Sequence, residues 1–401
     1  MLELRPILSA LWRHKISALL IAVQLGLTLA IVGNATVVIQ ERIERIARPT
    51  GVAVTDIVTA QFMPIAKNYD RLEAFRLDLD MIRQLPGVAA ATVSRAPLTG
   101  GGSGTGLYTA PNQEIGATGG AQFWGDEHLI DALGMKLVAG RAFTPNDITE
   151  ASFSSGWRPN MAIVTQQLAD KLFANGEALG QSIYFSGEDN PIEIVGIVER
   201  NLGPWPNSHN AGSTVFFPAV MDTQWFDYVV RAEPGQREAV AKLLEEKLAE
   251  RDPQRVVAVN LLEDKLDRYY AGDNTMIQVL SGVVSMLTFI VALGIVGLTV
   301  FWITQRQKQI GVRRALGASR SAISRYFLLE NLMIATTGIV LGTAAAQIFN
   351  RFLASEFEQP ALPLSTTAIC ALILFGISLA AALVPALRAA NISPAMATRS
   401  V

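Results

Sequence analysis

The chain has 401 residues, of which half are hydrophobic and 17% are charged, and its formal net charge is −2. Soluble proteins carry about a quarter charged residues, so the deficit indicates segments buried in a membrane. The near-neutral charge gives no basic field for nucleic acid, and no nucleic-acid partner is expected. The lone cysteine, Cys370, excludes an intrachain disulfide, and three scattered histidines give no metal-ligand spacing.

Four charge-free runs are each long enough to span a membrane once as a helix, since about 20 apolar residues cross the hydrocarbon core. They cover residues 16–40, 274–305, 331–350 and 359–387. The first run also resembles a secretory signal peptide, because basic residues precede it and Gly33-Asn34-Ala35 looks like a cleavage site. Signal-peptide cores run only about 7–15 residues, which favours a retained membrane anchor.

Basic residues near the span ends predict the topology, because Lys and Arg are retained on the cytoplasmic side. Three segments are basic. Arg5, Arg13 and Lys15 precede the first span, residues 304–330 join the second and third spans, and Arg388 and Arg399 follow the fourth. Both termini are therefore expected in the cytoplasm, and residues 41–273 on the outer side of the cytoplasmic membrane.

Residues 41–273 are expected to form an α+β domain on two helical stalks, which continue the first span and lead into the second. Both ends of this region have the pattern strand, helix, strand, predicted over 54–60, 70–84 and 88–94, and again over 226–231, 236–251 and 255–260. Two such units are the parts of a split, ferredoxin-like fold.

The middle of this domain, residues 96–222, is expected to be an inserted, mainly β subdomain. Its predicted strands are 161–164, 182–185 and 192–198, with the last two joined as a hairpin. The expected organisation therefore has three parts. Residues 1–40 are the cytoplasmic N-terminus and the first span, and residues 274–401 are a permease domain with the other three spans. Between them, residues 41–273 are a core domain, of which 41–95 and 223–273 are the porter-like part with its stalks.

Motifs for catalysis are absent from the sequence: it has no G-x-x-x-x-G-K-[ST], G-x-S-x-G or H-E-x-x-H. The glycine-rich stretch 100–106 lacks a lysine and a following helix, and we interpret it as a flexible loop. Asp78 and Asp80 lie two apart on a predicted helix and point to different faces, so both are interpreted as solvated surface charges. We expect neither an enzyme nor a cofactor in this chain.

The segment 304–330 contains six basic residues and no acidic residue before Glu330. A helix is predicted over 305–316, with Gly317 as its C′ cap and Ser319 as the N-cap of the next helix. Val312, Ala315, Leu316, Ser319 and Ile323 lie close to one side at helical spacing, although the break at Gly317 limits how far that side is continuous. Two interpretations are open: a basic loop that fixes topology and binds lipid head groups, or a coupling helix that docks on a cytoplasmic partner.

The third span contains two further features. Glu330 is either an interfacial carboxylate satisfied by water or a nearby arginine, or a hinge or partner contact. Gly338 and Gly342 lie four residues apart, which allows close helix approach. We expect them to pack within the chain, against the second or fourth span, rather than at a dimer seam.

The loop sequence resembles a motif of FtsX/MacB-type ABC permeases. The segments QIGVRRALGAS and FLLE, residues 309–319 and 327–330, are similar to the family's run after the second helix, and 384–394 is similar to its closing run. Three outer segments, 137–143, 169–173 and 192–198, resemble pieces of the MacB-type periplasmic core domain. Gln309 departs from the acidic residue often found there, and residues 396–399 follow the usual ending only loosely.

The resemblance implies a dimeric permease, formed with a second copy or a sister permease, in the bacterial inner membrane. It implies docking of a cytoplasmic ABC ATPase, which binds ATP and Mg²⁺, on Ile310, Gly311, Arg313, Arg314, Leu316, Gly317, Ser319, Arg320 and Glu330. Some family members carry a fused ATPase domain; here Met1 lies shortly before the first span, so a separate ATPase subunit is expected.

In such permeases ATP-driven closure moves the outer domain, a process called mechanotransmission, without a substrate path through the membrane. A periplasmic adaptor and an outer-membrane channel are expected partners in export, beside membrane lipid. Two alternatives remain open: a lipoprotein-releasing permease, which shares four spans and a large outer domain, and a signalling scaffold that activates a periplasmic hydrolase.

Overall fold

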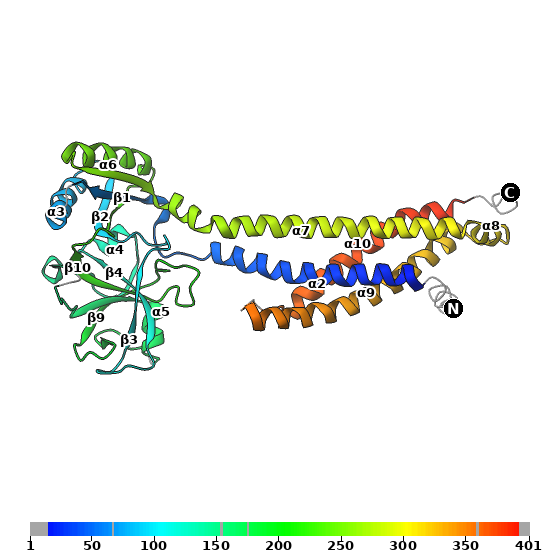
Figure 1. Cartoon of the computed structure of the whole chain (residues 1–401), viewed down its shortest axis with the longest axis horizontal. Coiled ribbons are helices and arrows are strands. Elements are labelled where there is room, and N and C mark those ends of the chain that lie inside the picture. Colours follow the sequence, from blue (N-terminus) through cyan, green and yellow to red (C-terminus); the bar gives the residue numbers. More distant parts are fainter. Residues whose placement is uncertain (1–14, 66–67, 153–154, 175, 358–360, 393–401) are drawn as a thin grey trace. The chain divides into compact units, whose positions relative to one another are not determined.

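The computed structural model describes residues 15–65, 68–152, 155–174, 176–357 and 361–392 (Figure 1). The chain divides into two compact units, one comprising residues 1–46 and 273–401 and the other residues 47–272. The basic residues Arg5, Arg13 and Arg399, and residues 396–399 of the closing run, lie outside the described residues.

The first unit, here called the membrane unit, is helical. Within the described residues four helices are long and apolar enough to cross a membrane: α2 (Lys15–Ile46), α7 (Leu262–Gln305), α9 (Arg320–Phe357) and α10 (Leu364–Ala390). The four predicted spans are confirmed. Helix α7 is continuous from Leu262, so the predicted helix that leads into the second span is confirmed too.

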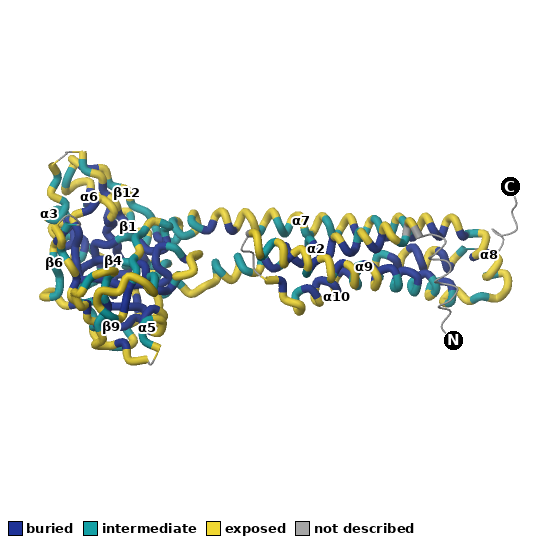
Figure 2. Tube along the Cα trace, turned by 60° about the horizontal axis from the view of Figure 1, so that its bottom comes forward, coloured by how far each residue is buried: buried dark blue, intermediate teal, exposed yellow. Residues whose placement is uncertain are grey.

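The four helices differ in how far they are buried. In their most apolar windows, 56% of α2 is buried inside the protein but only 17% of α7 (Figure 2). Helix α2 packs on α9 and α10, with Ile21, Leu25 and Leu29 fully buried. Helix α2 is therefore the centre of the membrane unit.

The crossing of α2 and α9 depends on three glycines. A Cβ atom on Gly342 would lie 2.6 Å from the Cα of Gly26, and one on Gly338 would lie 2.8 Å from the carbonyl oxygen of Ala22. The two backbones are thus in direct contact, as small residues permit in membrane helices. The glycine pair packs within the chain as expected, but against the first span; the expected partner, the second or fourth span, was wrong.

The second unit, here called the outer unit, contains a four-stranded antiparallel sheet covered by two helices. Its strands are β1 (Ile57–Pro64), β2 (Val88–Ser94), β11 (Asp227–Ala232) and β12 (Arg255–Leu261), in the order β12-β1-β11-β2. Helices α3 (Arg71–Ile82) and α6 (Arg237–Arg251) each connect two of them. This is the predicted split ferredoxin-like fold; β1 starts at Ile57 rather than Val54 because Val54–Asp56 form a 3₁₀ turn.

The inserted segment forms a small barrel. Six strands pair in a closed ring, in the order β4-β3-β8-β9-β7-β10 and back to β4. They are β3 (Ser103–Tyr108), β4 (Thr118–Gly125), β7 (Met161–Thr165), β8 (Ser182–Phe185), β9 (Ile192–Val198) and β10 (Thr214–Met221). Closure removes exposed strand edges. The three predicted strands and the β8–β9 hairpin are confirmed.

Two short strands extend the barrel: β5 (Leu137–Gly140) pairs with β9, and β6 (Thr149–Ala151) pairs with β10. The connections between strands contain the short helices α4 (Leu129–Ala132) and α5 (Gln166–Leu172) and a 3₁₀ turn at Pro145–Asp147. One expectation for this region was wrong. Residues 103–106 of the glycine-rich stretch belong to β3 rather than to a loop, because β3 pairs with both β4 and β8 to close the ring.

Asp78 is buried, and its interpretation as a surface charge was wrong. Its side chain is 1% exposed and accepts hydrogen bonds from Nη1 and Nη2 of Arg255 and from the Tyr228 hydroxyl. Arg251 Nε makes a further contact at 3.1 Å. Burial, together with the charge of Asp78, raises the pKa of Tyr228 far above its usual range. Asp80 is exposed, as expected.

We predict that Gly342→Leu separates α2 from α9 and lowers the thermal stability of the membrane unit. Overpacking typically costs about 1–3 kcal/mol, and here the close neighbour is backbone, which cannot rotate away. Thermal unfolding of the detergent-solubilised full chain measures the effect. Gly376 is the matched control, because a Cβ there meets nothing within 4 Å; equal losses for Gly342→Leu and Gly376→Leu would contradict the close crossing.

We predict that Asp78→Asn destabilises the outer unit by about 3–5 kcal/mol, because it leaves the buried charge of Arg255 uncompensated. Chemical unfolding of the full chain, followed by tryptophan fluorescence, measures the change. Asp80→Asn is the control on the same helix, and as an exposed substitution it should change stability by no more than about 0.5 kcal/mol. If both variants behave alike, Asp78 does not hold the cluster together.

Candidate functional site: the loop between α7 and α9

A short helix, α8 (Gln307–Ala315), occupies the basic segment between α7 and α9. Arg306 separates it from α7 with non-helical backbone angles, and Leu316 is its C-cap, so the predicted helix over 305–316 is confirmed only over residues 307–315. Nine residues are too few for a stable isolated helix, since about 12–15 are marginal in water. Helix α8 must therefore be held by its contacts with the rest of the membrane unit.

The turn after α8 is a Schellman motif, as the sequence predicts for Gly317. The Gly317 N–H donates to Arg314 O at 3.2 Å and the Ala318 N–H to Arg313 O at 3.0 Å, with Gly317 at φ +95°. Ser319 then caps α9, because its hydroxyl accepts the N–H of Ala322 at 3.2 Å. Two successive caps fix the angle between α8 and α9.

One side of α8 is anchored in an apolar cluster. Ile310 is 4% exposed and packs with residues from the ends of α7, α9 and α10, namely Ile303, Ile323, Phe327, Ala386, Ala389 and Ala390. Gly311 is buried beside it. The guanidinium of Arg313 lies 5.2 Å from the ring centroid of Tyr326 on α9, a cation–π contact. These contacts join α8 to three membrane helices.

A buried ion pair fixes the junction between α7 and α8. Arg306 Nη1 donates to the two carboxylate oxygens of Glu330 on α9 at 3.0 and 3.2 Å, and both residues are buried. An isolated buried charge is costly, so each residue requires the other. Of the two interpretations of Glu330, the structure supports a carboxylate that is satisfied by a nearby arginine. The next residue, Asn331, donates to Ser378 on α10, which ties α9 to α10 at the same level.

The opposite side of α8 is exposed and combines apolar and basic side chains. Leu316 is 84% exposed and Val312 is 49% exposed, with Lys308, Arg313 and Arg320 exposed around them. We call these five residues the α8 surface. Two exposed apolar side chains thus lie among three exposed basic ones. Among the described residues, no group of three His, Cys, Asp or Glu side chains is placed to hold a metal ion.

The structure separates the residues of the predicted docking set into two groups. Arg313, Leu316, Gly317, Ser319 and Arg320 are exposed and Arg314 is half-buried, whereas Ile310, Gly311 and Glu330 are buried. Ile323 also points into the cluster, so the predicted apolar side does not continue past Gly317. The sequence allowed a nearby arginine as the partner of Glu330, but it did not identify Arg306, 24 residues away, as that arginine.

Two family models match this chain. The MacB-like periplasmic core domain matches residues 16–247, and the FtsX-like permease C-terminal domain matches residues 281–394. Among curated relatives, the macrolide export ATP-binding/permease protein MacB of Neisseria gonorrhoeae is 26% identical over 327 residues, which are 79% of this chain and 48% of the relative. The chain thus spans about half the length of the MacB relatives that it matches.

A second relative is the uncharacterized ABC transporter permease YknZ of Bacillus subtilis, 25% identical over 279 residues and 66% of each chain. Among solved structures, the extracellular domain of YknZ matches at 17% identity and a TM-score of 0.32, over 50% of this chain and 99% of that one. The periplasmic region of MacB from Actinobacillus actinomycetemcomitans matches at 15% identity and a TM-score of 0.34, over 55% of this chain and 95% of that one.

The core-domain model alone covers more than half of the chain, and the permease model covers the last three membrane helices. The chain therefore belongs to the family of multi-pass ABC transporter permeases that combine a MacB-like periplasmic core domain with an FtsX-like permease domain.

Proposed function

We propose that this chain is the permease subunit of a MacB-like ABC transporter, which couples ATP hydrolysis by a separate ATPase subunit to movements of its outer unit. The observation that carries the proposal is the two-sided construction of α8. One side is exposed as the α8 surface, and the other is anchored in the ends of α7, α9 and α10.

Docking of the ATPase is assigned to the α8 surface. ATP and Mg²⁺ are then bound by the partner, since the 401 residues contain no G-x-x-x-x-G-K-[ST] motif. The exposed Leu316 supplies an apolar anchor and the surrounding basic residues favour an acidic rim on the partner. Both relatives named above are ABC transporter proteins with a permease function in their names, which supports a role beside an ATPase.

Transmission of the ATPase motion is assigned to α7. This helix has 44 residues without a break, about 66 Å in length, and it begins in the outer unit and ends next to α8. Its membrane part is buried less than the other helices, so little packing opposes its movement. A displacement of α8 is passed to α7 at Arg306 and to α9 through Glu330.

The remaining parts of the proposal concern orientation and assembly. Both termini and the α8 surface face the cytoplasm and the outer unit faces the periplasm, in agreement with the basic residues around the spans. The permease works as a dimer, with a second copy or a sister permease, and with a periplasmic adaptor and an outer-membrane channel in export from the periplasm. The MacB relatives are named for macrolide export, which supports export as the class of activity.

We predict that Leu316→Asp, alone or with Arg313→Glu, reduces recruitment of the ATPase at least tenfold, because it places charge at the centre of the docking patch. The tagged full chain is purified from its host, and the co-purified ABC ATPase is quantified by mass spectrometry. Ile115→Asp is the matched control, since Ile115 is 90% exposed in the outer unit. Recruitment that is unchanged by Leu316→Asp, or the lack of any ABC ATPase with the unaltered chain, would refute docking on α8.

We predict a different result for Glu330→Gln, which changes no residue of the α8 surface and leaves Ile310 in its apolar cluster, but removes the charge that pairs with Arg306. The ATPase should still co-purify, whereas export and the stimulation of ATP hydrolysis by the permease should fall about tenfold. The double variant Arg306→Glu/Glu330→Arg restores a buried pair and should recover part of the stimulation. Loss of recruitment in parallel with loss of stimulation would instead mean that the pair only maintains the fold of the loop.

A further inference from the structure

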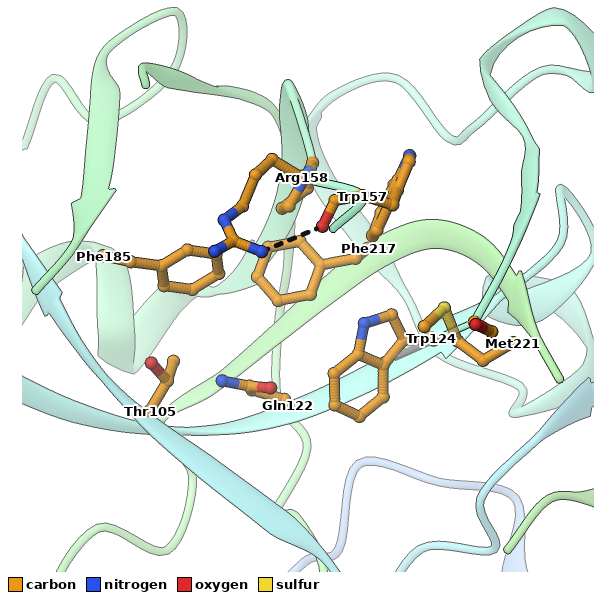
Figure 3. Close-up of a pocket in the computed structure, with 10 residues that line it drawn as sticks. Thr105, Gln122, Trp124, Trp157, Arg158, Phe185, Phe217 and Met221 are labelled. Carbon is orange, nitrogen blue, oxygen red and sulfur yellow. Dashed lines mark hydrogen bonds between the residues drawn. The ribbon is translucent and has the colours of Figure 1, made fainter. Parts of the chain in front are cut away.

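The barrel of the outer unit has an open mouth with a cavity of about 230 Å³ (Figure 3). Among the described residues, its lining comes from four barrel strands and from Ser152 and residues 157–159, which follow β6. These lining residues are Thr105, Gln122, Trp124, Ser152, Trp157, Arg158, Pro159, Phe185, Phe217 and Met221. Mouths of β-barrels are preferred positions for small-molecule sites. None of these residues belongs to the membrane unit or to the α8 surface.

The alternation of side chains shows that the cavity is inside the barrel. On β4, Phe123 points outward and packs with Ile57 and Val229 of the four-stranded sheet, whereas Gln122 and Trp124 lie on the opposite face. Below the cavity the interior is filled, because Leu107 and Ile183, each two residues further along a lining strand, are fully buried. The barrel is therefore packed at one level and open above it.

The walls of the cavity are aromatic. The ring of Phe217 lies 6.2 Å from that of Trp124 and 5.7 Å from that of Phe185, in tilted and edge-on arrangements. Figure 3 shows Trp157 and Arg158 on the opposite side of the cavity from Thr105 and Gln122. Trp157 remains only half-buried at the rim. Such walls suit a flat aromatic ring system, which can stack or meet their edges.

The polar groups of the cavity indicate an uncharged ligand. Arg158 is already compensated, since its Nε lies 2.9 and 3.1 Å from the two carboxylate oxygens of Glu188, and its Nη1 donates to Trp157 O at 3.3 Å. The side-chain amide of Gln122 has no hydrogen-bond partner among the described residues and faces the cavity (Figure 3). An amide offers one acceptor and two donors. Gln122 thus offers an unused hydrogen-bonding group to the cavity, whereas the charge of Arg158 is paired with Glu188.

We propose that the barrel mouth binds an uncharged bicyclic aromatic molecule, oriented by a hydrogen bond with Gln122. The size follows from the volume, because a dry cavity of about 150 Å³ holds one benzene ring and this cavity is larger by about half. The site stands on the outer unit alone, and neither its presence nor its absence bears on ATPase docking at α8.

The test uses indole and 1-methylindole, which differ in one N–H donor, as probes of the detergent-solubilised full chain. Calorimetric titration or saturation-transfer NMR should show saturable binding of both. Trp157→Ala, which removes the rim, and Thr105→Phe, which fills the cavity from the opposite side, should each weaken binding of both probes at least tenfold. Trp225→Ala is the matched control, since Trp225 is 58% exposed and lies outside the cavity.

Gln122→Leu separates the contribution of the hydrogen bond from that of the aromatic walls. It should weaken indole about fivefold, the equivalent of one hydrogen bond, and leave 1-methylindole unchanged. Circular dichroism establishes that each variant is folded. If Trp157→Ala does not fold, Thr105→Phe alone tests the cavity. The proposal is overturned by non-saturable binding, by equal effects of Trp157→Ala and Trp225→Ala, or by equal effects of Gln122→Leu on the two probes.

Discussion

The buried ion pair between Arg306 and Glu330 is the interaction on which the loop depends. It lies where α7 stops and α8 begins, and it joins that junction to α9, which carries the carboxylate. Buried pairs add little net stability, because desolvation offsets most of the attraction, but they tolerate few alternative geometries. The pair therefore fixes the position of α8 more than it stabilises the protein. With Ile310 in the apolar cluster, it explains how nine residues form a helix at all.

In the outer unit, too, buried carboxylates pair with arginines that are distant in sequence. Asp78 on α3 is neutralised by Arg255 at the start of β12, and Asp126 after β4 by Arg83 at the end of α3. The first pair holds the two helices of the ferredoxin-like part on its sheet, and the second joins that part to the barrel. Burial raises the pKa of Asp126, although the charge of Arg83 opposes the shift. The unit is thus held by two salt bridges as well as by its apolar core.

The sequence predicts the parts of this protein that depend on local pattern. The four spans, the split ferredoxin-like strands, and the caps at Gly317 and Ser319 follow from hydropathy, alternation and backbone preference. What it missed depends on pairing between distant segments. The burial of Asp78 requires Arg255, the strand over Ser103–Tyr108 requires ring closure, and the contact of Gly342 requires Gly26 on another helix. In the loop, the sequence does not show which residues are buried and which are exposed. Their burial depends on how α8 packs against the ends of α7, α9 and α10.

The two sides of α8 also explain why the motif in this loop mixes residues of different kinds. Ile310, Gly311 and Glu330 are buried and maintain the position of the helix, whereas Arg313, Leu316 and Arg320 are exposed. In the proposed function, a partner bound to the exposed side contacts a helix whose buried side packs against α7, α9 and α10. Because those contacts are apolar packing and an ion pair rather than a flexible linker, α8 cannot move without moving the helix ends. What the proposed function requires of this short helix is therefore its attachment at both ends, by the Arg306–Glu330 pair and by the apolar cluster, rather than its length.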